Sequence, residues 1–154
     1  MSNVYIRRVR AIRLEFEAAR QAITYVQRHW QKYNIYIDLN QLNPADFAEA
    51  GTNVEQTYFI RLFAEFEGIL RDHLTTNHTS LVVPDKPKID WLVSRVAKSE
   101  VFKVNTELRR RLDDIRDYRN SVAHRTQAAV PAIPLVNALS TFTTILAKLP
   151  DPLS

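Results

Sequence analysis

One helical pattern runs without interruption through the first thirty or so residues of the chain. Apolar side chains recur there every three or four positions, at Ile6, Val9, Ile12, Phe16, Ala19, Ile23 and Val26. This spacing puts them on one stripe of an α-helix and predicts a helix over about residues 4–33. The chain has only two glycines among its 154 residues. Long helical patterns with so little glycine favour an all-α helical bundle.

Further helices follow from the same spacing. We expect a short helix that opens at Asn43-Pro44, because proline is favoured in the first turn. Asn53 with Gln56 three residues later resembles a capping box and predicts the start of the next long helix. Residues 35–39 are expected to form a loop. The main helices are predicted over about 54–75, 88–98, 105–125 and 134–148, the last with Pro134 at its start. The expected fold is one domain, 1–154, of about five helices with two long antiparallel ones.

Composition narrows the function classes. The chain is 45% hydrophobic and 25% charged, which is typical of a soluble globular protein. It has no cysteine, which excludes disulfides, a thiol nucleophile and a cysteine-based zinc site, and fits a cytoplasmic protein. We expect no signal peptide and no membrane-spanning helix. The formal net charge of +4 weakly favours a polyanion such as nucleic acid as partner.

The stretch RDYRNSVAHR, residues 116–125, needs an explanation because Arg119 falls on the apolar side of its helix. On a helical wheel Arg119 lies in the middle of the stripe formed by Leu108, Leu112, Ile115 and Val122. His124 lies about 140° around from Arg119, on the same face as Asn120. A straight helix therefore does not place Arg119 and His124 side by side.

Arg119 has several possible roles, because an unpaired buried charge is costly. It can extend along the surface to water, pair with Glu65 or Glu67 of the 54–75 helix, or point into a cleft or a subunit interface. His124 near a helix C-terminus can equally be a solvated residue that the helix dipole stabilises. The residues alone leave these alternatives open.

The other candidate sites are less informative. His73 lies on the apolar stripe of its helix and is expected to be a core histidine, and His29 to be surface or packing. His73 and His78 do not have zinc-ligand spacing, and no acidic third ligand is evident, so we expect no metal and no cofactor. Phosphate-binding glycine loops and the HExxH and GxSxG motifs are absent from the sequence. The acidic patch of Asp113, Asp114 and Asp117 is expected to be solvated.

The stretch YRNSVAHR resembles the signature of the HEPN superfamily, the small all-helical domains named for higher eukaryotes and prokaryotes nucleotide-binding. That signature has an arginine, a polar residue that is often asparagine, and a histidine after four to six intervening residues. Here these are Arg119, Asn120 and His124. The stretch FIRLFAEFEGILRDHL is similar to the second long helix of many HEPN proteins, with Glu67 or Glu65 as its acidic residue. The resemblance covers about residues 4–148 and implies an HEPN-like bundle.

The resemblance implies a metal-independent endoribonuclease of the toxin or defence type. Two protomers of such a homodimer bring their motifs together across a symmetric cleft that binds RNA. Arg119 would then hold the scissile phosphate and His124 would transfer protons. Asn120 would orient either His124 or the phosphate, with Glu67 or Glu65 in support. An antitoxin or other regulatory protein is a possible partner.

Some HEPN toxins carry a modified tyrosine two residues after the histidine, where this chain has Thr126. The alternatives are a non-catalytic HEPN module that binds nucleotide, nucleic acid or protein, and an unrelated helical bundle.

Overall fold

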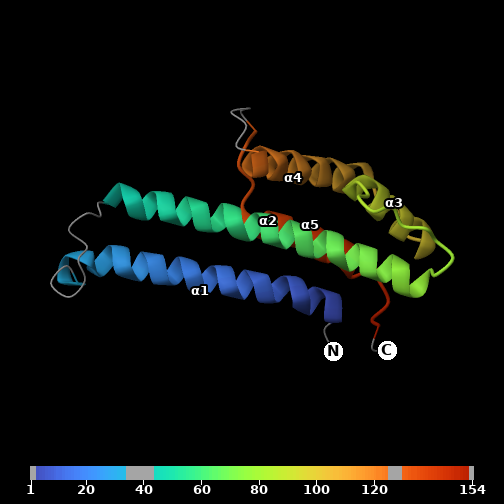
Figure 1. Ribbon diagram of the computed structural model, residues 1–154, viewed down its shortest axis with the longest axis horizontal. Helices are drawn as coiled ribbons and strands as arrows, with labels where there is room; N and C mark the ends of the chain where they lie inside the picture. The colour runs from blue at the N-terminus through green and yellow to red at the C-terminus, as the bar shows by residue number, and fades with distance from the viewer. Residues whose placement is uncertain (1–2, 34–43, 125–129, 153–154) are drawn as a thin grey trace.

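A computed structural model describes residues 3–33, 44–124 and 130–152 of the chain. Five α-helices occupy these ranges: α1 (Val4–Tyr33), α2 (Pro44–Asn77), α3 (Ile89–Ser99), α4 (Thr106–His124) and α5 (Leu135–Leu146). The long helices α1 and α2 lie side by side and run antiparallel (Figure 1). These ranges contain no β-strand, so the predicted all-α bundle of about five helices is confirmed. The predicted loop at 35–39 lies outside the described residues.

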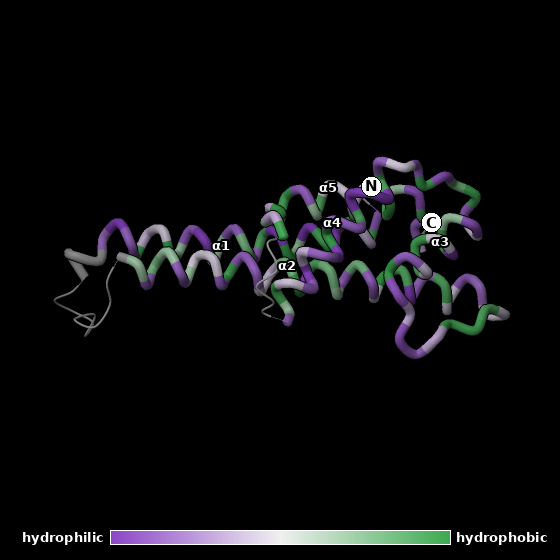
Figure 2. The backbone as a smooth tube through the Cα atoms, turned by 90° about the horizontal axis from the view of Figure 1, so that it is seen from above, coloured by the Kyte–Doolittle hydropathy of each residue, from purple (hydrophilic) through white to green (hydrophobic). Residues whose placement is uncertain are grey.

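Helix α2 is the centre of the bundle, because each of the other four helices contacts it. Its side chains Leu62, Phe66 and Leu70 are fully buried. The Phe66 ring stacks on the Phe142 ring of α5, with 4.0 Å between ring centroids. Far from the termini, the ends of α1 and α2 extend beyond the other helices as a two-helix arm (Figure 2). The core therefore lies at the end of the molecule away from this arm, where α3, α4 and α5 cover α2.

The sequence prediction divided the α2 region wrongly. Pro44 does begin a helix, but this helix continues without a break to Asn77, so Asn53 lies inside it and is no cap. The threonines around the expected boundary are satisfied within the helix, since the Thr52 hydroxyl donates to the Ala48 carbonyl and the Thr57 hydroxyl to the Asn53 carbonyl. Packing of the long α1 along α2 overrides the local capping signal.

Helix α4 carries most of the RDYRNSVAHR stretch. A cap at its start and apolar contacts along its inner face hold it in place. The Asn105 side chain caps its start by accepting a hydrogen bond from the Leu108 N–H, at 2.8 Å. Leu112 and Ile115 are buried. Tyr118 packs edge-on against Phe59 of α2, with ring centroids 4.8 Å apart. This packing points the next residue, Arg119, toward α2.

No helix of the described residues is long and apolar enough to cross a membrane.

The turn after α3 contains a backbone conformation that favours glycine. Val101 has φ 52° and is the one non-glycine residue with positive φ among the described residues. The Phe102 N–H donates to the Ala97 carbonyl across this turn, at 3.0 Å, which closes the helix end in the manner of a Schellman motif. A β-branched side chain in this region is strained. The strained turn fixes the position of Glu100, the residue just before it.

We predict that Val101→Gly stabilises the protein. Val101 is 90% exposed, so removal of its side chain loses little packing. Relief of the left-handed strain, less the greater chain entropy of glycine, gives an expected gain of roughly 0.5–1 kcal/mol. Urea unfolding measures the difference. Val82, which is 87% exposed, provides the matched control, since Val82→Gly has no positive φ to relieve and should lower stability slightly. Equal effects of the two changes would contradict the prediction.

Candidate functional site

Arg119 lines a cleft of about 400 Å³ where α2, α3 and α4 meet. Helix α2 contributes two residues, the start of α3 and its preceding residue contribute three, and α4 contributes three. In that order they are Phe63, Glu67, Lys88, Ile89, Asp90, Arg116, Arg119 and Asn120. The cleft therefore contains three cationic side chains and two carboxylates.

The guanidinium of Arg119 is half-buried, and its N–H groups lack a full set of hydrogen-bond acceptors among the described residues. Its Nη1 donates to the Asn120 side-chain oxygen at 3.0 Å, and its central carbon lies 5.2 Å from the centre of the Phe63 ring. Its Nε–H is buried and has no acceptor among the described residues. The Nε side of a guanidinium, together with Nη2, is a fork that matches two oxygens of a carboxylate or phosphate. On this side of the Arg119 guanidinium, the buried Nε–H is left for an acceptor from outside the described residues.

Of the two glutamates considered for Arg119, only Glu67 lines the cleft. Burial raises the pKa of the Glu67 carboxyl, and the positive charges of Arg119 and Arg71 oppose this rise. Glu65 instead faces α1, where it accepts a hydrogen bond from Arg8 Nε at 2.6 Å. Glu67 is thus the acidic residue that acts on Arg119, and Glu65 joins the two long helices.

The other cations of the cleft differ in their pairing. Arg116 contacts three carboxylates, with 2.8 Å to Asp90, 2.8 Å to Asp113 and 3.1 Å to Asp117, so its charge is neutralised locally. Lys88 is the N-cap residue of α3 and makes no side-chain capping bond. The N-terminus of a helix carries unpaired N–H groups and a partial positive charge. Lys88 and the start of α3 therefore add positive potential to the cleft that Arg119 lines.

His124 does not line the Arg119 cleft. It is the last residue of α4 and is exposed, one turn beyond Asn120 on the same helix. The structure thus brings Arg119, Asn120 and Glu67 together and leaves His124 outside. This agrees with the helical-wheel expectation that one straight helix separates Arg119 from His124. Thr126 lies outside the described residues.

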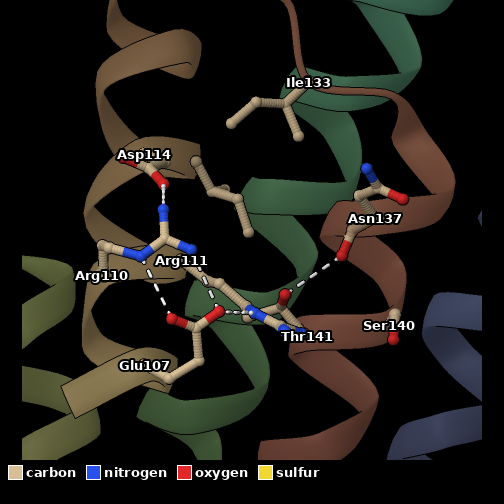
Figure 3. A pocket seen from close by; sticks show the side chains of 9 residues that line it. Glu107, Arg110, Arg111, Asp114, Ile133, Asn137, Ser140 and Thr141 are labelled. Carbon is tan, nitrogen blue, oxygen red and sulfur yellow. Dashed lines mark hydrogen bonds and ion pairs between the residues drawn. The ribbon is translucent and has the colours of Figure 1, made fainter.

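A second cleft of about 400 Å³ lies between α4 and α5, and its arginines are already paired (Figure 3). Arg110 contacts Glu107 and Asp114, each at 3.0 Å, and Arg111 contacts Glu107 at 2.8 Å. The hydrogen bonds from Arg110 and Arg111 lower the pKa of the Glu107 carboxyl to about 2. These guanidinium groups are therefore less available to an anionic ligand than that of Arg119.

The expectation that no acidic residue joins His73 and His78 is wrong. Nε2 of His73 lies 2.8 Å, and Nε2 of His78 lies 3.1 Å, from the same Oε1 atom of Glu100. The three ligand atoms all lie within 4.8 Å of one another. Glu100 follows α3, 22 residues after His78, so spacing in the sequence gave no signal of this cluster. His73 is a fully buried core histidine, as expected.

No family model, curated protein or solved structure matches this chain. Its function is therefore inferred from the residues of the site.

We predict that Glu67→Gln raises stability at neutral pH. The raised pKa of Glu67 means that the folded protein binds this proton more tightly than the unfolded chain does. The stability that comes from this proton is fully present below pH 4.5, the usual pKa, and is lost as the pH rises through the higher folded pKa. Glutamine mimics the protonated form, so the gain should appear at pH 7 and vanish at pH 4. Thermal melts at both pH values measure it.

Glu65→Gln is the matched control on the same helix. It removes a carboxylate that pairs with Arg8, so it should give no gain at pH 7. A lower stability of Glu67→Gln at pH 7 would indicate instead that Glu67 and Arg119 form a stabilising ion pair.

Proposed function

We propose that this protein is a metal-independent endoribonuclease that acts as a homodimer through Arg119, Asn120 and His124. The observation that carries the proposal is the half-buried Arg119 guanidinium, whose Nε–H has no acceptor among the described residues. A buried donor without an acceptor costs free energy, and a ligand that supplies the acceptor recovers it. A phosphodiester offers two oxygens in the geometry that the Nε–Nη2 fork matches.

The surroundings of Arg119 support an anionic ligand of this kind. Asn120 holds Nη1 and so fixes the plane of the guanidinium. Lys88 and the uncapped start of α3 favour negative charge in the same cleft. Glu67 attracts Arg119 without closing an ion pair with it, and its burial disfavours its own negative charge. A phosphate therefore meets a net positive cleft.

The residue types suit cleavage of RNA without a metal. The 2′-hydroxyl of RNA attacks the adjacent phosphorus while an imidazole takes its proton, and the P–O5′ bond breaks as the 5′ oxygen takes a proton from an acid. The products are a 2′,3′-cyclic phosphate and a 5′-hydroxyl. Histidine can accept and donate a proton near neutral pH, which suits His124. Arg119 would stabilise the negative charge that develops on the phosphate oxygens.

A second copy of the chain is needed in this proposal, because His124 is outside the cleft that Arg119 lines. A two-fold axis near the end of α4 would bring the motifs of two copies to one shared site. Two copies of His124 could then serve as base and acid in the same reaction. On the resemblance to HEPN proteins alone, we further propose a toxin or defence role, with an antitoxin or another regulatory protein as partner.

A non-catalytic module that binds nucleotide, nucleic acid or protein is the second candidate. The contact of Arg119 with the Phe63 ring favours it, because such a contact is also a packing interaction. In this second candidate Arg119 is a structural residue that packs on Phe63, and His124 does no chemistry.

We predict that the purified protein cleaves total RNA in EDTA and that His124→Ala lowers the rate by roughly 10²–10⁴-fold, the usual effect of losing a general acid or base. Arg119→Ala should also abolish cleavage. Mapping of the RNA ends should find cyclic phosphates. His29→Ala changes a histidine on α1, away from the α4 site, and is the matched control that should keep full activity.

Melting curves separate loss of activity from loss of fold. Arg119 forms no ion pair with a described carboxylate, so Arg119→Ala should cost only about 0.5–1 kcal/mol from the lost ring contact. A loss of about 3 kcal/mol or more would indicate a structural arginine that neutralises a buried carboxylate. Absence of cleavage by a folded, dimeric wild type would favour the binding module.

We also predict that His124→Ala inhibits the wild type when the two are refolded together. In a mixture of one part wild type to three parts variant, wild-type homodimers make up about one sixteenth of all dimers if subunits pair at random. If both copies of His124 serve one site, activity should fall to about that fraction. Independent sites, or a monomeric enzyme, would retain about one quarter. The cleavage rate at constant total protein decides between these values, and gel filtration verifies that the variant still dimerises.

A further inference from the structure

We propose that His73, His78 and Glu100 form a binding site for a zinc ion. The three residues come from the last turns of α2, from the residue directly after α2 and from the end of α3. They are the one group of three or more histidine, aspartate or glutamate side chains, among the residues that the structure describes, whose ligand atoms converge in this way. This site is independent of the proposed ribonuclease activity.

The distances within the cluster fit one bound ion. Zinc binds imidazole nitrogen and carboxylate oxygen at about 2.0–2.2 Å in tetrahedral geometry, so two of its ligand atoms lie roughly 3.3–3.5 Å apart. The two Nε2 atoms lie 2.8 Å and 3.1 Å from Glu100 Oε1, and no pair among the three atoms exceeds 4.8 Å. The Glu100 oxygen would therefore have to move about 0.2–0.7 Å away from each nitrogen, and the two imidazoles already lie within the 4.8 Å span of the cluster. Two imidazoles and one carboxylate are a ligand set that zinc proteins use.

His73 is held in place for this role. Its side chain is fully buried, and its ring packs edge-on against Tyr5 of α1 with centroids 5.9 Å apart. Its other nitrogen, Nδ1, lies 3.0 Å from the Asn77 amide and 3.4 Å from the Tyr5 hydroxyl. A histidine that binds metal through Nε2 carries its proton on Nδ1 and donates it to a neighbour. The Tyr5 hydroxyl oxygen can accept this proton, and so can Asn77 if its amide turns over.

The other two ligands leave the site open to solvent. Glu100 is 17% exposed and His78 is 31% exposed in their side chains, whereas His73 is 0% exposed. An ion can therefore enter from the side of His78. With three protein ligands, the fourth position of a tetrahedral zinc is left to water or to an external ligand.

The fold around Glu100 gives the ion a structural effect. Glu100 is the C-cap of α3 and precedes Val101, whose strained backbone turns the chain. The zinc would join the end of α2 to the end of α3 across the connection of residues 78–88. It would thus constrain the connection between these two helices.

The test uses the full chain, freed of metal with EDTA and then dialysed. Zinc titration by calorimetry should give one ion per chain, and zinc at about a hundredfold excess over its Kd should raise Tm by roughly 5–10 °C. Cobalt should give the strong visible absorption of a tetrahedral site. His78→Gln and Glu100→Gln should each weaken zinc binding at least about tenfold, since even residues behind the ligands have effects of this size. His29→Gln, a histidine on α1 outside the cluster, should bind like wild type.

Nitrogen NMR of the wild type supplies a measurement that needs no variant. Zinc should shift the ring-nitrogen signals of His73 and His78 together and leave those of His29 unchanged. Absence of zinc binding by the wild type would overturn the proposal. Binding that either His78→Gln or Glu100→Gln leaves unweakened, or that shifts other histidines instead, would overturn it as well. RNA cleavage in EDTA is a separate outcome, because the proposed reaction uses no residue of this cluster.

Discussion

The burial of α2 is the constraint on which the rest of the structure depends. Every other helix contacts α2, and its stripe from Phe59 to Leu74 is almost completely excluded from water. Each fully buried large apolar side chain contributes about 1.5–3 kcal/mol relative to an exposed one. The stacked pair of Phe66 and Phe142 attaches α5, and the contact of Phe59 with Tyr118 attaches α4. These contacts hold the stretch of α2 that carries Glu67 and His73.

The same rigid helix serves both candidate sites. Glu67 and Phe63 of α2 form one wall of the Arg119 cleft. His73 lies six residues after Glu67 on the same helix, which is about 9 Å of helical rise. Sites built on a packed helix hold their side chains more closely than sites on loops. Burial raises the pKa of the Glu67 carboxyl on this helix, and the anion-binding role proposed for the cleft would account for a carboxylate in this position.

The contrast between the arginines of the bundle is what singles out Arg119. Arg8, Arg110 and Arg116 each contact at least two carboxylates at the surface. Such exposed pairs contribute little to stability, but they do occupy the guanidinium groups. Arg119 instead touches an aromatic ring and has a buried Nε–H without an acceptor in the described part of the chain. Enclosed positive charge with unused donors is what an anion-binding site requires.

The sequence by itself determined the all-α class, the approximate ranges of α1, α3, α4 and α5, and the separation of Arg119 from His124. These depend on helical periodicity and on proline, which act within a few residues of chain. Only the tertiary structure decided that α2 is continuous through Asn53, that Glu67 rather than Glu65 faces Arg119, and that Glu100 meets His73 and His78. Each of these depends on which helix packs on which face. Contacts between residues far apart in the chain leave no periodic signal in the sequence.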